Sequence, residues 1–132
     1  MDKTDEKILS IMRNDARMPF SRIAREIGIS EPAIRKRVLN LISRKEARFR
    51  VEIEHQFSAI LFGGVETKIP TSQVTDRIKR IPEVEWSYEI SGDHDFICKI
   101  SSQTIGKINE CVERIRQTAG VIDTSTVFIL KK

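Results

Sequence analysis

The chain has 132 residues, a net charge of +4 and a hydrophobic content of 39%. No run of about 18 apolar residues is present, and the acidic first six residues lack the apolar stretch of a secretion signal, so neither a membrane span nor export is expected. Two cysteines are too few for a disulfide framework, which favours a reducing, cytoplasmic setting.

The charge is distributed unevenly along the chain. Residues 1–50 contain 13 Lys/Arg and 7 Asp/Glu, whereas residues 51–132 contain 10 Lys/Arg and 12 Asp/Glu. This asymmetry predicts a basic module that binds a polyanion, followed by a second module with a different task.

Three helices are predicted in the first half. The first begins at Asp2, whose carboxylate can cap it, and ends near Asn14. The second begins at Ser21 and ends at Gly28, because glycine tolerates the positive φ that commonly terminates a helix. A third helix follows Ser30, its expected N-cap, so that two helices flank a tight turn as in a helix-turn-helix.

The third helix has one apolar side and one cationic side. Ile34, Val38 and Leu41 recur at helical spacing, while Lys36 and Asn40 lie opposite them. In a helix-turn-helix this helix enters the major groove of double-stranded DNA, where cations reach phosphates or guanine edges. The residues expected to contact DNA are Ser21, Arg22, Ser30, Pro32, Ala33, Arg35, Lys36, Arg37, Asn40, Arg44 and Lys45.

The second half predicts a sheet with two helices. Residues 48–54 alternate between apolar and charged side chains, as in a strand or an extended connector. The elements expected after it are a strand over 59–69, a helix over 71–80 capped by Thr71 or Ser72, strands over 84–90 and 96–100, a helix over 104–118 and a strand over 121–130. This order is that of the ferredoxin-like βαββαβ fold.

The predicted fold class is therefore α+β. A winged-type helix-turn-helix of three helices (residues 1–46) is joined by a strand-like linker (residues 47–58) to a βαββαβ oligomerisation domain (residues 59–132), to which the family resemblance described below adds effector binding. Both helices of such a domain cover one face of its sheet, and Trp86 and Tyr88 make the other face adhesive, so we expect this half to form a homodimer.

The two halves together resemble the Lrp/AsnC family of leucine-responsive and asparagine-responsive transcription regulators. The motifs that carry the resemblance are Asp2-x-x-Asp5-x-x-Ile8-Leu9, Asp15-Ala16-Arg17, Ile23-Ala24, Gly28-Ile29-Ser30, Ile34-Arg35-Lys36-Arg37-Val38, Gly92-Asp93-His94-Asp95 and Thr124-Ser125-Thr126. The resemblance implies a sequence-specific DNA-binding regulator that is associated with the nucleoid. It also implies a higher assembly of dimers, and it implies that assembly or DNA binding responds to a small amino acid.

The effector residues implied by this resemblance are Gly92, Asp93, Asp95, Thr124 and Thr126. Carboxylates can bind an α-ammonium group, and hydroxyls can bind an α-carboxylate. Two acids in the motif favour a cationic effector such as lysine or arginine. The alternative is that Gly92 and the aspartates serve only the geometry of a hairpin turn.

One segment departs from the family pattern. The family usually has a glycine and two apolar residues after the third helix, whereas this chain has Arg44-Lys45-Glu46-Ala47 and then Arg48-Phe49-Arg50. The additional cations could follow a flanking phosphate backbone.

The sequence predicts no catalytic residue, no metal ligand set and no cofactor. Cys98 and Cys111 lack the paired spacing of a zinc site and are expected in the core, and His94 between two acids is expected to be solvated. Two alternative functions are open: an enzyme similar to the siroheme decarboxylases, which share this architecture, and a ferredoxin-like RNA-binding module, although residues 96–100 lack the aromatic pattern of the latter.

Overall fold

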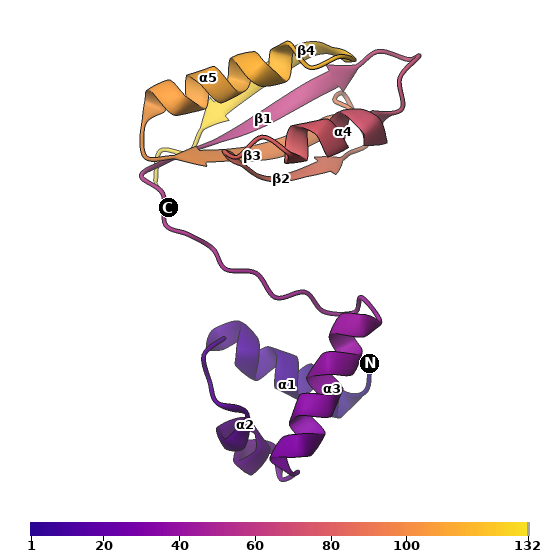
Figure 1. The fold of residues 1–132 in the computed structure, drawn as a ribbon, viewed down its shortest axis with the longest axis vertical. Helices are drawn as coiled ribbons and strands as arrows, with labels where there is room; N and C mark the ends of the chain where they lie inside the picture. The colour runs from indigo at the N-terminus through magenta and orange to yellow at the C-terminus, as the bar shows by residue number, and fades with distance from the viewer. Residues whose placement is uncertain (132) are drawn as a thin grey trace. The chain divides into compact units, whose positions relative to one another are not determined.

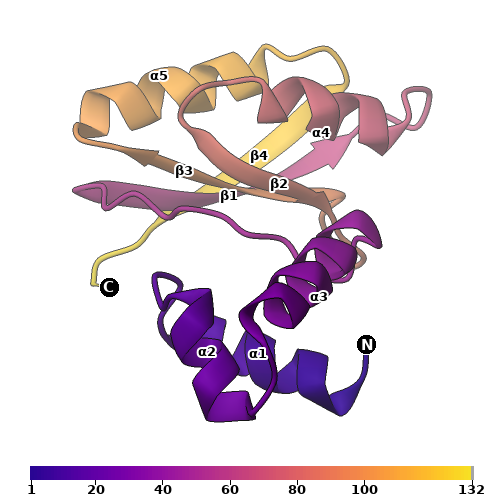
Figure 2. The same cartoon turned by 60° about the horizontal axis from the view of Figure 1, so that its bottom comes forward.

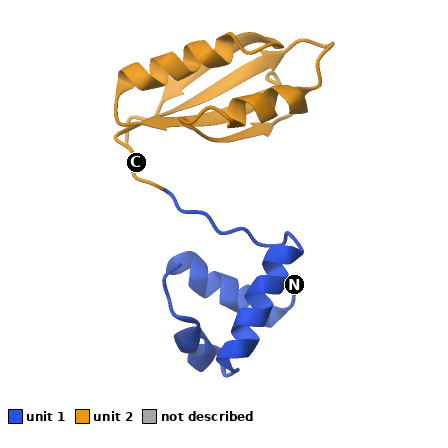
Figure 3. Ribbon diagram, viewed as in Figure 1, with its two compact units in different colours: residues 1–52 blue, residues 53–132 orange. Residues whose placement is uncertain are grey.

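The computed structural model describes residues 1–131 and divides into two compact units, Met1–Glu52 and Ile53–Lys132 (Figure 3). Each unit has its own hydrophobic core. The expected linker, residues 47–58, spans the boundary between the units, and its last two residues belong to the first strand.

The first unit consists of three helices, α1 (Lys3–Asn14), α2 (Phe20–Ile27) and α3 (Glu31–Ser43) (Figure 1). This confirms the predicted order of helices. The helices share one small core of buried side chains, contributed by Ile8, Met12, Ile23, Ala24, Ile34 and Val38.

The helix ends follow from local sequence. Asp2 accepts a hydrogen bond from the Asp5 amide (2.8 Å), and Asp5 accepts one from the Asp2 amide (3.2 Å), which forms a reciprocal capping box on α1. Gly28 ends α2 with φ at 86°. The predicted start of α2 is one residue late: the helix begins at Phe20, behind Pro19, so Ser21 lies within its first turn and makes no capping bond.

The second unit is a four-stranded sheet with two helices. Its elements are β1 (Phe57–Val65), α4 (Thr71–Lys79), β2 (Val84–Glu89), β3 (Phe96–Ser102), α5 (Ile105–Arg116) and β4 (Val121–Phe128). The strand order is β2-β3-β1-β4 with every pair antiparallel, and Figure 2 shows both helices on one face of the sheet. The ferredoxin-like prediction is therefore confirmed.

The caps of the two helices in this unit differ. Thr104 caps α5 by accepting a hydrogen bond from the Lys107 amide at 3.2 Å. The prediction that Thr71 or Ser72 caps α4 is wrong, because Pro70 occupies the N-cap position without a side-chain bond and both residues are already helical.

Residues 44–56 adopt neither helix nor strand, so the alternating segment after α3 is an extended connector and no β-wing follows α3 there. Its apolar side chains point into solvent: Phe49, Val51 and Ile53 are 43%, 89% and 64% exposed.

The core of the second unit lies between the sheet and its two helices. Alternate residues of β1, such as Ala59 and Leu61, are fully buried on this side. Gly63 continues this alternation, and it pairs with Phe96 of β3. A Cβ atom at Gly63 would overlap the Phe96 ring, so the glycine makes room for the largest fully buried side chain.

We expect Gly63→Ala to lower the free energy of unfolding of the full chain by about 1–3 kcal/mol, because the added methyl overpacks the core against Phe96. Urea denaturation followed by circular dichroism measures the change. Gly106→Ala in the first turn of α5 is the matched control, since a Cβ atom there meets nothing within 4 Å. Equal stability of Gly63→Ala and the wild type would contradict this account of β1.

Candidate functional site

The third helix presents a cationic surface while its opposite side anchors it. Ile34, Val38 and Leu41 are 0%, 5% and 3% exposed, whereas Lys36 and Asn40 on the other side are exposed. The Ser30 hydroxyl accepts a hydrogen bond from the Ala33 amide (3.3 Å), which fixes the start of the helix as predicted. The helix is therefore held by its aliphatic side with its polar side in solvent.

Most of the expected DNA contacts lie on the surface of the first unit. The exposed residues among them are Ser21, Arg22, Ser30, Pro32, Arg35, Lys36, Asn40, Arg44 and Lys45, while Ala33 and Arg37 are half-buried. Within residues 1–131, Lys36 and Arg44 have no ion-pair partner. These two cations are therefore available to an external anion.

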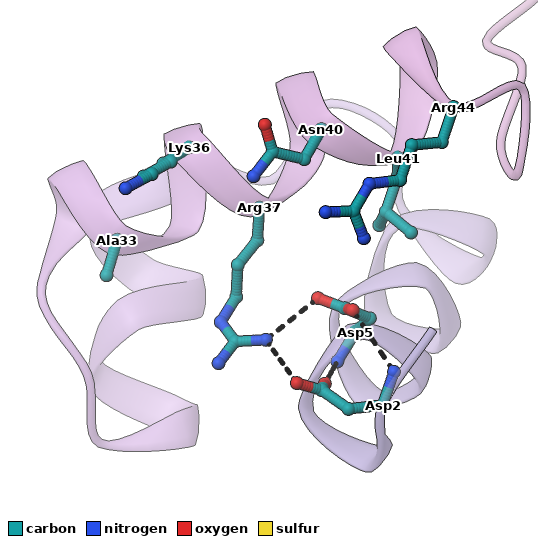
Figure 4. Close-up of a pocket in the computed structure, with 8 residues that line it drawn as sticks. All are labelled: Asp2, Asp5, Ala33, Lys36, Arg37, Asn40, Leu41 and Arg44. Carbon is teal, nitrogen blue, oxygen red and sulfur yellow. Dashed lines mark hydrogen bonds and ion pairs between the residues drawn. The ribbon is translucent and has the colours of Figure 1, made fainter.

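Arg37 differs from these cations because two carboxylates already engage it. Its Nη1 atom donates to Asp2 Oδ2 at 2.7 Å and to Asp5 Oδ1 at 3.0 Å, as the dashed lines in Figure 4 show. The hydrogen bond that Arg37 donates to Asp2 lowers the pKa of the Asp2 carboxyl below its usual value, and it raises the pKa of Arg37. Arg37 thus connects α3 to the capped end of α1.

The two remaining arginines on the flank of the surface are also paired. Arg35 donates to Glu31 at 3.0 Å, one turn earlier on α3, and its guanidinium lies 5.3 Å from the centre of the Phe20 ring. Arg22 lies 3.9 Å from Glu26 within α2. Exposed pairs of this kind contribute little stability, so DNA phosphates can compete for these arginines.

A shallow groove runs between α1 and α3, with a volume of about 340 Å³. Its lining residues are Asp2, Asp5, Ala33, Lys36, Arg37, Asn40, Leu41 and Arg44. Figure 4 shows Arg37 turned toward the two aspartates, whereas Lys36 points away from them.

Sequence reasoning missed Leu39 on this surface. Leu39 is 60% exposed, and it lines a second hollow of about 470 Å³ together with Pro32, Lys36 and Asn40. The signal was present, since a turn of about 100° per residue places Leu39 only about 60° from Lys36 around the helix.

The segment after α3 takes the conformation of a glycine turn without a glycine. Lys45 has φ at 61°, and within residues 1–131 it is the one non-glycine residue with a positive φ. Its amide donates to the Ile42 carbonyl (3.0 Å) and the Glu46 amide donates to the Leu41 carbonyl (2.9 Å), the two bonds of a Schellman motif. Lys45 thus occupies the position at which glycine is usually found.

We expect Lys45→Gly to raise the free energy of unfolding by about 0.5–1 kcal/mol, because glycine adopts a positive φ without steric cost. The shift of the urea unfolding transition measures the gain. Lys45→Ala removes the same charge but keeps a Cβ atom, so it should give no gain. An equal gain in both variants would assign the effect to charge and not to backbone conformation.

The expected effector residues lie at the end of the β2–β3 hairpin and on β4. Gly92 has φ at 111° and shapes the turn. Asp95 has a structural contact, since its Oδ2 atom accepts a hydrogen bond from the Val65 amide at 2.7 Å. Asp93 is exposed, and within residues 1–131 no hydrogen bond or ion pair engages its carboxylate.

The two threonines lie on the helix side of the sheet. Thr124 and Thr126 pair with Gly63 and Leu61, and Leu61 faces the helical core. Thr124 accepts a hydrogen bond from Arg116 of α5 at 3.0 Å, while Thr126 Oγ1 is buried and has no hydrogen-bond partner among the described residues. Among the described residues, the Thr124 hydroxyl is therefore engaged within the protomer, whereas the Thr126 hydroxyl is not.

The candidate residues for metal or redox chemistry are accounted for by packing. His94 lies against Phe62, with ring centroids 5.2 Å apart. Cys98 and Cys111 are core residues, as predicted, and burial raises the pKa of Cys98 to about 12 and that of Cys111 to about 11, so neither is a thiolate at neutral pH. Residues 1–131 contain neither a cluster of metal-ligating side chains nor a helix long and apolar enough to cross a membrane.

The geometry defines a class of protein: a DNA-binding helix-turn-helix unit followed by a separate ferredoxin-like unit. A family model described as the AsnC-type helix-turn-helix domain matches residues 1–42, and one described as the Lrp/AsnC ligand binding domain matches residues 62–132. The chain belongs to the Lrp/AsnC family and is a helix-turn-helix transcriptional regulator with a ligand-binding domain.

Individual relatives agree with this assignment. The chain is 37% identical to the HTH-type transcriptional regulator LysM of Saccharolobus solfataricus, over 99% of this chain and 94% of that protein. It is similar to the crystal structure of the leucine response regulatory protein LrpA of Mycobacterium tuberculosis, with a TM-score of 0.85, 25% identity and coverage of 100% of this chain and 94% of that chain. The regulator NMB0573 of Neisseria meningitidis, solved as an L-Met complex, shares the fold at a TM-score of 0.79 and 18% identity, over 100% of this chain and 91% of that chain.

Proposed function

We propose that this chain acts in the cytoplasm as a homodimeric, sequence-specific regulator whose DNA binding responds to an amino acid. The observation that carries the proposal is α3: Ile34 and Val38 anchor it, and Lys36 and Asn40 project from its free side. A two-fold dimer would present two copies of α3 to successive major grooves, with half-sites about 10 base pairs apart.

Exposed apolar side chains support association with a second copy. The connector exposes Val51 and Ile53, which a strand-like pairing between two connectors would cover. On the face of the sheet away from the helices, Trp86 and Tyr88 lie 5.4 Å apart, and Tyr88 is 49% exposed. Burial of these surfaces in a homodimer would remove them from water.

The hairpin supports an amino-acid site at the end of β2 and β3. Asp93 has an unengaged carboxylate that would bind the ammonium group of an amino acid, and a second ammonium or guanidinium on lysine or arginine would suit the neighbouring Asp95. Gly92 would shape the turn beside the ligand through its positive φ, and the space next to it is open, since a Cβ atom there meets nothing within 4 Å. We also place Thr124 and Thr126 of a neighbouring copy in this site, because the Thr126 hydroxyl has no hydrogen-bond partner among the described residues.

Effector binding would act on DNA affinity through the arrangement of copies. Each unit has a separate core, and the connector has no helix or strand of its own that would carry a local shift from one unit to the other. An effector that binds one assembly more tightly than another would change the spacing of the α3 helices on DNA.

Lys36→Ala tests the DNA surface. We expect the variant to lose about 1–3 kcal/mol of specific binding free energy if Lys36 contacts a base, because the side chain has no partner within the described chain and projects from the centre of the surface. Fluorescence anisotropy with a duplex selected from a random library measures the loss.

Lys79→Ala, at the end of α4 in the other unit, removes the same charge and should leave affinity nearly unchanged. Wild-type affinity should fall steeply with salt, with a slope of about −0.9 per neutralised phosphate. Unchanged affinity in Lys36→Ala would remove this side chain from the interface.

Asp93→Asn tests the effector site. We expect the neutral variant to bind DNA as the wild type does but to lose its response to lysine or arginine, because the amide cannot neutralise an ammonium group. The shift of the DNA-binding curve on addition of each amino acid is the measurement. Asp76→Asn on α4 is the charge-matched control, and an intact response in Asp93→Asn would place the effector elsewhere.

A further inference from the structure

The free side of α3 carries one large apolar residue in the midst of its polar groups. Leu39 is 60% exposed, although exposed leucines are common enough that exposure alone decides nothing. Its position is informative, because Leu39 lies on the same side of α3 as Lys36 and Asn40, which form the proposed DNA-binding surface.

Leu39 and Pro32 form the apolar part of a defined hollow. The hollow has a volume of about 470 Å³, and charged or polar side chains of Glu31, Arg35, Lys36 and Asn40 surround it. The Glu31 carboxylate on its rim is paired with Arg35 at 3.0 Å, so the net charge of the rim is positive because of Lys36.

The cationic rim indicates what kind of group occupies the hollow. An apolar partner protein would have to desolvate Arg35 and Lys36 without supplying charges for them. The major groove supplies both features at once, because phosphates lie on either side of it and the C5-methyl group of thymine is the apolar group that it displays. The apolar pair Leu39 and Pro32, flanked by cations, is therefore suited to contact a thymine methyl group in a duplex.

We propose that Leu39, together with Pro32, contacts the C5-methyl group of a thymine and thereby determines specificity for an A·T pair in each half-site. The proposal rests on the proposed function, since it requires α3 to lie in the major groove. Leu39 forms no hydrogen bond, so its contribution is van der Waals contact and removal of the methyl group from water.

The test replaces thymidine by deoxyuridine, which removes the methyl group and keeps the base-pairing hydrogen bonds. A duplex is first selected from a random library with the purified full chain and is then remade with deoxyuridine at one position at a time. We expect about fourfold weaker binding at one thymine in each half-site, which corresponds to about 0.8 kcal/mol for one buried methyl-sized group.

Leu39→Ala identifies the protein side of this contact. The variant should show no deoxyuridine penalty at that position, whereas Ile42→Ala, which truncates another exposed aliphatic residue of α3 (44% exposed), should retain the penalty. Comparison of the variants separates the methyl contact from any effect of deoxyuridine on the DNA itself, because that effect is common to all three proteins.

Three results would overturn the inference: no deoxyuridine penalty at any position, the same penalty in Leu39→Ala, or a change in oligomeric mass on Leu39→Ala, which would assign the residue to a contact between copies. Its failure differs from failure of the proposed function. If the library yields no enriched duplex, the proposed function fails, whereas a selected duplex whose binding needs Lys36 but ignores the methyl groups refutes only the role of Leu39.

Discussion

The packing of α3 on its own three-helix unit is the constraint on which the functional surface depends. Two sides of one helix have opposite requirements, since Ile34 and Val38 must leave water and Lys36 must remain in it. The core that holds α3 is small, with six buried residues shared among three helices. A shift of the apolar spacing by one residue would rotate the buried side of α3 by about 100° and bring Arg35 inward, so the spacing of these aliphatic residues fixes what the helix presents.

The start of α1 contributes to the same constraint through electrostatics. Asp2 and Asp5 cap their own helix, and the same carboxylates bind Arg37 of α3 at 2.7 and 3.0 Å. These acids engage Arg37, whereas Lys36 and Arg44 on the same helix surface have no ion-pair partner among the described residues. Arg37 thus fixes the orientation of α3 on α1, whereas Lys36 and Arg44 remain available for DNA recognition. This division would not follow from a count of basic residues.

Local signals made the helix-turn-helix predictable, because Gly28 and Ser30 act within one or two turns of their own positions. The order of elements likewise made the ferredoxin-like sheet predictable. Contacts between distant residues were not predictable: Arg37 bonds to residues 35 and 32 positions earlier, and Asp95 bonds to the Val65 amide 30 positions earlier. The positive φ of Lys45 was also missed, since the turn is imposed by the bonds that close α3 and not by the preference of lysine.

The hairpin motif of the second unit shows why a family motif does not assign roles by itself. Gly92 shapes the turn, Asp95 satisfies the amide of a buried residue at a point where β1 and β4 change register, and His94 packs on Phe62. These structural roles would account for most of the motif even if no ligand bound there. Asp93 is the member for which no intramolecular duty is evident among the described residues, so its carboxylate is where the ligand-binding and the purely structural interpretations of the motif differ. A site that joins Asp93 of one copy to the threonines of another would lie between copies. Ligand binding and association of copies would then be coupled, and an effector that favours one arrangement of copies would alter how the α3 helices are spaced.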